Sequence, residues 1–331
     1  MDFGSSSIDL SLIPVSEPPP GQVSNFVDAE SISWTVRLAI YLTLPIMAIA
    51  VVLRAYVRLQ KRQVGIDDCF LVLGAVSHSI AAEKKTTFLM PGFHLYQATA
   101  ASYCGFLMPY LLHDAFGRHS WNVPMSSLLR PWIYKNSATA AALYNMSAMC
   151  TKVAILAFYL RIFSVSSRAC AFIWIGIVLI TLGYLASTAA TIFYMVPHHG
   201  DGGWGSPGNF RRLNDGLGFL NTTLGGFGVV TDTYVIAIPT VIVSRLHLPP
   251  HKKIGVACVF LIGFVSLGCC IAGTALRAQA LVADFADSWL NLRVQALSVT
   301  ELNIGIFCAC APIFYTLLKT WMQRAGSACC T

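Results

Sequence analysis

The chain has 331 residues, of which 56% are apolar and only 11% are charged, and its mean hydropathy is +0.64. About a quarter of the residues in an ordinary soluble domain are charged, so this composition excludes a soluble enzyme. A membrane β-barrel is disfavoured because its strands would alternate apolar and polar residues. The net charge of +7 comes from basic residues scattered over short connections, a pattern that does not indicate binding to nucleic acid.

Seven stretches are apolar and long enough to cross a bilayer, which takes about 20 residues in a helix. In chain order they are 36–57, 67–113, 137–163, 170–196, 217–243, 254–276 and 296–320. The predicted fold is therefore all-α, a bundle of seven transmembrane helices within one domain. We expect residues 1–32 to form a disordered outer tail, 33–320 the membrane domain and 321–331 a short cytoplasmic tail.

The basic residues at the ends of these stretches predict the orientation. Eleven lie on the side that follows spans one, three, five and seven, against eight on the opposite side. The positive-inside rule then places the N-terminus outside and the C-terminus in the cytoplasm. We expect a multi-pass protein of the endoplasmic reticulum or the plasma membrane, in contact with membrane lipid.

The second stretch is irregular because 67–113 is too long for a single crossing and carries Glu83, Lys84 and Lys85 near its middle. Segment 76–97 begins with Val-Ser and ends with Tyr-Gln, which splice-donor and splice-acceptor sequences can encode. We interpret 76–97 as a retained intron whose removal leaves one span of ordinary length. A genuine re-entrant or extracellular excursion is the alternative.

Short motifs along the chain occur in the order found in a known family. They are LRAYVR at 53–58, GIDD at 65–68, GRHSW at 117–121, FYLRIF at 158–163 and IFCACAP at 306–312. The chain resembles the fungal rhodopsin-like domain family of integral membrane proteins, in particular its satratoxin-cluster type, which is related to fungal surface-sensing seven-span receptors. The resemblance implies a seven-helix fold over about 34–320. The chain departs from the family pattern in segment 76–97 and in having no cysteine in 197–221.

Despite the family name, retinal is not expected, and no other cofactor is predicted. A retinal Schiff base needs a lysine inside the last helix, and 296–318 contains none before Lys319 at the membrane edge. A metal site is not expected either. His119, His198 and His199 lie on the outer side without the spacing that zinc ligands need.

Two charged residues are expected near the middle of the bilayer. At a rise of 1.5 Å per residue, Lys152 lies far above Arg161 and Asp232 lies far above Arg245, so both sit at mid-membrane depth and should pair. A charge at that depth is costly and suggests a functional site. The pair either fixes how two helices pack or lines a pocket that orients a polar group on a lipophilic ligand.

Further candidates lie nearer the outer surface. Arg277 and Glu301 are expected to meet at the mouth of the bundle, as an acid/base pair or as a rim salt bridge. We therefore take Asp232 and Glu301 as candidate proton donors, and Lys152, Arg277 and His119 as candidate binding residues.

Two classes of function remain open. The first is a membrane protein of a secondary-metabolite pathway that binds a lipophilic small molecule and cyclises or isomerises it. The alternative is a surface-sensing receptor of the G-protein-coupled type, which would also contact a cytoplasmic signalling partner. Fold resemblance alone does not decide between them.

Overall fold

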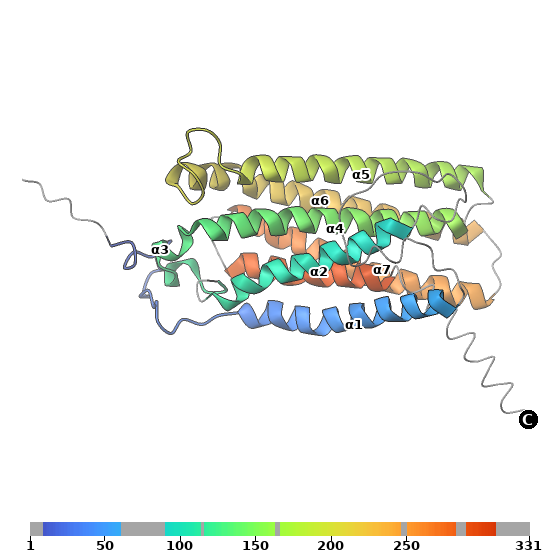
Figure 1. The fold of residues 1–331 in the computed structure, drawn as a ribbon, viewed down its shortest axis with the longest axis horizontal. Helices are drawn as coiled ribbons and strands as arrows, with labels where there is room; N and C mark the ends of the chain where they lie inside the picture. Colours follow the sequence, from blue (N-terminus) through green and yellow to red (C-terminus); the bar gives the residue numbers. More distant parts are fainter. Residues whose placement is uncertain are drawn as a thin grey trace, which may run out of the picture.

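The computed structural model describes residues 9–60, 90–113, 116–162, 166–245, 250–282 and 289–308. Within these ranges the regular structure is helical, apart from one isolated bridge between Pro14 and Pro124. Long helices that follow one another in sequence run in opposite directions along a common axis (Figure 1). They are α1 (Ser33–Gln60), α2 (Met90–Leu112), α4 (Pro131–Ile162), α5 (Ser167–Met195), α6 (Pro207–Arg245), α7 (Pro250–Val282) and a last helical segment, 289–308. Two short helices, η2 (Ser120–Asn122) and α3 (Met125–Leu128), precede α4.

Five helices in the described part of the chain contain a stretch long and apolar enough to cross a membrane. These stretches are Ser33–Ala50, Pro131–Ala157, Ser167–Met195, Gly216–Val241 and Gly263–Leu281. The all-α prediction is therefore confirmed for the described residues. The second and seventh predicted spans fall partly on 61–89 and 309–331, which lie outside those residues, so the count of seven stays a prediction.

Large apolar side chains cover the outward faces of several helices. On α5 alone Phe172, Trp174, Leu179, Leu182 and Phe193 are each more than half exposed. Soluble proteins rarely expose continuous apolar patches of this kind, since water contact with them is unfavourable. Membrane lipid is the solvent that suits this surface.

Only part of the predicted insertion lies among the described residues. Residues 90–97 are helical and continue into 98–112 as one helix, α2. Residues 76–89 fall outside the described part of the chain. The interpretation of 76–97 as a retained intron therefore stays a prediction.

The N-terminal segment closes one end of the bundle together with the connection between α2 and α4. We call this the capped end. The Val15 amide donates a hydrogen bond to the Val123 carbonyl at 3.0 Å, and the Ile32 amide donates to the Gly117 carbonyl at 2.9 Å. Further hydrogen bonds join Leu10 and Ile13 to this connection. Side chains join the two segments as well, since Arg118 donates to the Phe26 carbonyl and Asn122 Oδ1 accepts from the Asn25 amide, both at 2.9 Å. The expectation that residues 1–32 form a disordered outer tail stays a prediction.

Gly183 allows α5 to approach α6 closely. A β-carbon at Gly183 would lie 2.3 Å from the Phe227 ring, so no larger residue fits without a shift of the helices. Small residues allow close backbone approach in membrane helices, where van der Waals packing drives association. This contact fixes the middle of α6, where Asp232 lies.

We expect Gly117→Ala to destabilise the capped end of the bundle. Gly117 has a φ of +84°, and a β-carbon there would lie 2.8 Å from both Ser31 Oγ and the Ser33 amide nitrogen. The left-handed backbone alone costs a residue with a β-carbon about 1–2 kcal/mol. Thermal unfolding of the purified protein should show a lower melting temperature.

Gly105→Ala is the matched control, because Gly105 is helical and nothing lies within 4 Å of a β-carbon there. Alanine in a helix is about 0.5–1 kcal/mol more stable than glycine, so this variant should melt no lower than the parent. Equal melting temperatures for the two variants would contradict the predicted strain at Gly117.

Candidate functional site

A buried ion pair joins α4 to α6 in the middle of the bundle. Lys152 Nζ lies 2.6 Å from Asp232 Oδ1, and the two side chains are 4% and 13% exposed. The same ammonium donates to the Gly228 carbonyl at 3.0 Å and to Thr231 Oγ1 at 2.9 Å. All three hydrogens of the ammonium are therefore used. The contact predicted between Lys152 and Asp232 is present, while its role stays a prediction.

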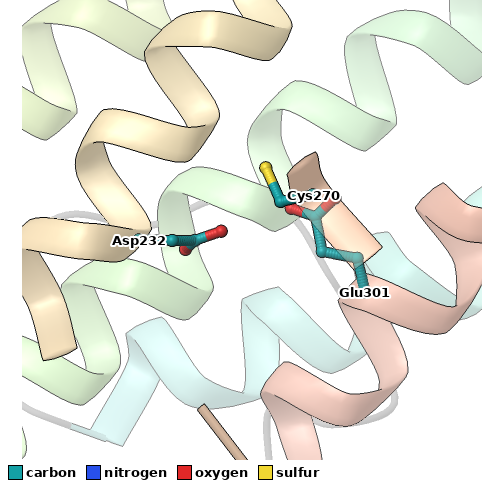
Figure 2. A group of neighbouring side chains, drawn as sticks. All are labelled: Asp232, Cys270 and Glu301. Carbon is teal, nitrogen blue, oxygen red and sulfur yellow. The ribbon is translucent and has the colours of Figure 1, made fainter. Parts of the chain in front are cut away.

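Three helices bring a second set of side chains together beside this pair. Asp232 on α6, Cys270 on α7 and Glu301 on the segment 289–308 point toward one another (Figure 2). One carboxylate oxygen or sulfur atom of each lies within 4.8 Å of the others. Cys270 and Glu301 are buried, and Asp232 Oδ2 has no hydrogen-bond partner among the described residues. The two candidate proton donors, Asp232 and Glu301, are thus close neighbours.

Three such ligand atoms could hold a metal ion, but the position of Lys152 disfavours one. Its ammonium lies 2.6 Å from Asp232 and would repel a cation bound to the same carboxylate. The ammonium already neutralises that carboxylate. This argument agrees with the expectation that the chain has no metal site, which stays a prediction.

Tyr144 on α4 contacts both Glu301 and Arg277. Its hydroxyl donates to Glu301 Oε2 at 3.2 Å, and the Arg277 guanidinium carbon lies 5.7 Å from the centroid of its ring. Arg277 Nη2 donates to Ser298 Oγ at 3.0 Å. No ion pair joins Arg277 to a carboxylate within the described ranges.

The expected pairing of Arg277 with Glu301 at the mouth is therefore replaced by a contact through Tyr144. Glu301 lies instead beside Asp232, at the level of the buried ion pair. Counting residues, as for Lys152 and Asp232, gives only the position of a side chain along the helix axis. Such counting ignores helix rotation and tilt, and rotation decides which neighbour a side chain meets.

A cavity of about 310 Å³ extends from the capped end of the bundle to this cluster. Phe116 and Leu128 line it at the capped end, while Tyr184, Gly228 and Cys270 line its inner end. Most of its remaining wall is apolar. The polar side chains that line it among the described residues are Tyr103, Tyr134, Ser137, Tyr144, Asn145, Tyr184, Thr191, Asn221, Arg277, Asn291, Gln295 and Ser298.

A second cavity of about 50 Å³ lies on the other side of the charged cluster. Lys152, Asp232 and Glu301 line this smaller cavity and do not line the larger one. The buried charges thus form a layer between the two cavities. Tyr144 lines the larger cavity and donates a hydrogen bond to Glu301, which is part of this layer.

His119 lies apart from both cavities, at the capped end. Its ring is stacked between Trp121 and Trp289, with both centroids 4.2 Å away and interplanar angles of 7°. This stack ties the connection before α4 to the last helical segment. His198, another of the outer histidines, has Nδ1 4.0 Å from Asp201 Oδ2.

Sequence reasoning missed Tyr144 and Cys270. A weak signal existed for both, because residues spaced by about two turns share one side of a helix. Cys270 lies seven residues before Arg277, and Tyr144 lies eight residues before Lys152. Tyrosine and cysteine are common in apolar helices, so their types alone did not mark a site.

Comparison with known proteins identifies the family. The family model described as the fungal rhodopsin domain matches residues 53–320. A SAT4 family membrane protein of Emericella nidulans is 26% identical over 216 residues, which cover 63% of this chain and 52% of that relative. A protein of Gibberella zeae named fugralins biosynthesis cluster protein 2 is 23% identical over 316 residues, which cover 92% of this chain and 71% of that relative.

The chain thus spans about half the length of the first of these relatives. No solved structure is significantly similar to it. The apolar helices and the membrane-protein relative agree on a multi-pass membrane protein. Since the family model covers most of the sequence, the chain belongs to the fungal rhodopsin domain family.

Proposed function

We propose that this protein binds a lipophilic intermediate of a secondary-metabolite pathway inside the membrane and transfers a proton to it. The observation that carries the proposal is the cavity of about 310 Å³ that ends at a layer of buried charges. Its volume lies at the lower end of the range for small-molecule sites, which combine apolar walls with a few polar groups. The Gibberella zeae relative is named for a biosynthesis cluster, which supports the pathway assignment.

Glu301 is the best-placed proton donor for the proposed reaction. Its carboxyl group accepts a hydrogen bond from the Tyr144 hydroxyl, which belongs to a residue that lines the cavity. In the proposed step the protonated Glu301 donates its proton to the Tyr144 oxygen while the Tyr144 hydroxyl passes its own proton to a double bond or carbonyl of the ligand. The resulting cation loses a proton from a neighbouring carbon, and that proton returns to the Glu301 carboxylate by the same route. Isomerisation or cyclisation by this route leaves the protein unchanged and needs no co-reactant.

Lys152 and Asp232 hold the layer in place for this chemistry. Asp232, the other candidate proton donor, is paired with the ammonium at 2.6 Å and acts in this proposal as the fixed anion. Glu301, the proposed donor, lies beside this anion, with a carboxylate oxygen of each within 4.8 Å of the other. The layer would thus keep one donor and one fixed anion side by side. Retinal has no part in the proposal.

The proposed topology has seven spans, with the N-terminus outside and the C-terminus in the cytoplasm. Glycosylation acceptor sequences fused to each end test it in fungal cells. We expect the N-terminal tag to be modified and the C-terminal tag to remain unmodified. Modification at both ends would contradict the odd number of spans, and modification at the C-terminus alone would reverse the orientation.

Deletion of the gene in the producing organism tests the function. We expect one lipophilic intermediate to accumulate while transcripts of the other pathway genes stay at their normal level. The wild-type gene should restore the product, whereas Ala141→Trp should not, because Ala141 lines the cavity. Leu182→Trp is the control, since Leu182 is 60% exposed on the outer face of α5.

The alternative is a surface-sensing receptor, and the same experiment separates the two. A receptor that controls the pathway would lower the transcripts of its genes on deletion, so no intermediate would accumulate. That result, or full product formation in the deletion strain, would contradict the proposed function. Its cytoplasmic signalling partner would then be the next object of study.

A further inference from the structure

We propose that the ligand of the large cavity is an acid, a lipophilic molecule whose carboxylate is bound by Arg277. The inference rests on the proposed function, since it specifies the chemical class of the small molecule bound there. Arg277 is a half-buried side chain of α7 whose guanidinium lines the cavity. A carboxylate is the partner that a guanidinium binds in a bidentate geometry.

The hydrogen-bonding capacity of Arg277 is largely unused. A guanidinium has five N–H donors, and within the described ranges one of these nitrogens, Nη2, donates a hydrogen bond, to Ser298 Oγ at 3.0 Å. Tyr144 also contacts Arg277, since the guanidinium carbon lies 5.7 Å from the centroid of the Tyr144 ring, whose face attracts the charge. A buried N–H donor that finds no acceptor is energetically costly. A ligand bound in the cavity would supply acceptors to the N–H groups of Arg277.

The charges around the cavity also favour an anion. Among the described residues that line it, Arg277 is the one side chain that carries a full charge. In the layer beneath, Lys152 is neutralised by Asp232. With Glu301 protonated, as the proposed proton transfer requires, no carboxylate in the described part of the chain serves Arg277 as a counter-ion. The carboxylate of a ligand would balance the positive charge of Arg277.

The shape of the cavity around Arg277 fits a carboxylate head with an apolar tail. Gln295 and Ser298 lie three residues apart on the last helical segment, so they share one face, and both line the cavity. A β-carbon at Gly225 would lie 3.3 Å from Arg277 Nη1, so glycine leaves room for the guanidinium. Toward the capped end Phe116, Leu128 and Leu292 add apolar surface to the walls, which suits the tail of the ligand.

Binding of radiolabelled dodecanoic acid to the purified protein in lipid nanodiscs tests the inference, with empty nanodiscs as the background. We expect saturable binding that unlabelled dodecanoic acid displaces. Methyl dodecanoate and dodecylamine should compete about 10- to 100-fold more weakly, because neither presents an anion to the guanidinium.

Arg277→Met should raise the dissociation constant for dodecanoic acid by a similar factor, and Arg277→Lys should recover part of the affinity because it keeps the charge. Arg168→Met is the matched control, since Arg168 is exposed at the start of α5 and should bind as the parent does. Size-exclusion profiles show whether each variant is folded. If Arg277→Met does not fold, the comparison of acid with ester on the parent protein decides.

Equal affinity for acid and methyl ester would overturn the inference while leaving a lipophile-binding function intact. Absence of saturable binding for either probe would count against the proposed function as well. The acid could come from the pathway or from membrane lipid. Mass spectrometry of acids that copurify with the protein from strains with and without the pathway genes separates these two sources, and either acid supports the inference.

Discussion

Removing one charge of the Lys152–Asp232 pair is expected to abolish most of the folded protein. Lys152→Met leaves the Asp232 carboxylate buried and without its cation, and Asp232→Leu leaves the ammonium in the same position. Breaking a buried pair costs about 3–5 kcal/mol, which is a large part of the 5–15 kcal/mol that stabilises a typical protein. Fluorescence-detected size-exclusion chromatography of tagged variants measures the loss directly.

The double variant, Lys152→Met with Asp232→Leu, should restore the amount of folded protein. It removes both charges at once, and apolar replacements of a buried pair are often neutral or stabilising. Thr231 keeps its hydrogen bonds to the Phe227 and Gly228 carbonyls, so no polar group is left without a partner. The variant should nevertheless fail to complement the deletion strain, because the charged layer is lost.

The three variants together separate a structural pair from a working one. A double variant that accumulates and also restores the product would show that the pair serves packing alone. Normal accumulation and full activity in both single variants would contradict any role for the pair. Reduced accumulation of the double variant would indicate that Met and Leu do not fill the space, and Lys152→Gln with Asp232→Asn then repeats the test with polar residues.

The Lys152–Asp232 contact could be predicted from the sequence because two simple rules meet there. Charged residues are rare in membrane helices and need partners, and a fixed rise per residue gives their depth. Two opposite charges at one depth therefore had one natural arrangement. The helical class and five membrane-length helices followed in the same way from continuous apolar runs.

Glu301 and the capped end show what such reasoning lacks. Rise gives depth but not rotation, so the sequence did not indicate that Glu301 turns toward Asp232 and away from Arg277. Likewise, hydrogen bonds join residues 10–32 to the connection before α4, and the stack of His119 between Trp121 and Trp289 joins segments far apart in the chain. Patterns in one sequence predict secondary structure, whereas these contacts depend on tertiary packing.

Glu301→Gln is expected to stop the chemical step while leaving ligand binding and folding intact. Glutamine has nearly the same shape, and its carbonyl oxygen can still accept the hydrogen bond from the Tyr144 hydroxyl. It has no acidic proton to give. General acid catalysis contributes about 10²- to 10⁴-fold, so product formation should fall by that factor in the complemented deletion strain.

Two further variants show whether the loss comes from the proton or from the shape of the site. Cys270→Ser replaces a neighbour of Glu301 that has no part in the proposed transfer, so product formation should stay near the parent level. Tyr144→Phe removes the hydroxyl through which the proton would pass, and its activity should fall as far as that of Glu301→Gln, since both interrupt one route. Dodecanoic acid should bind all three variants, because Arg277 is unchanged. Full product formation by Glu301→Gln would refute Glu301 as the donor and leave Asp232, the other carboxylate of the cluster, as the acid to test.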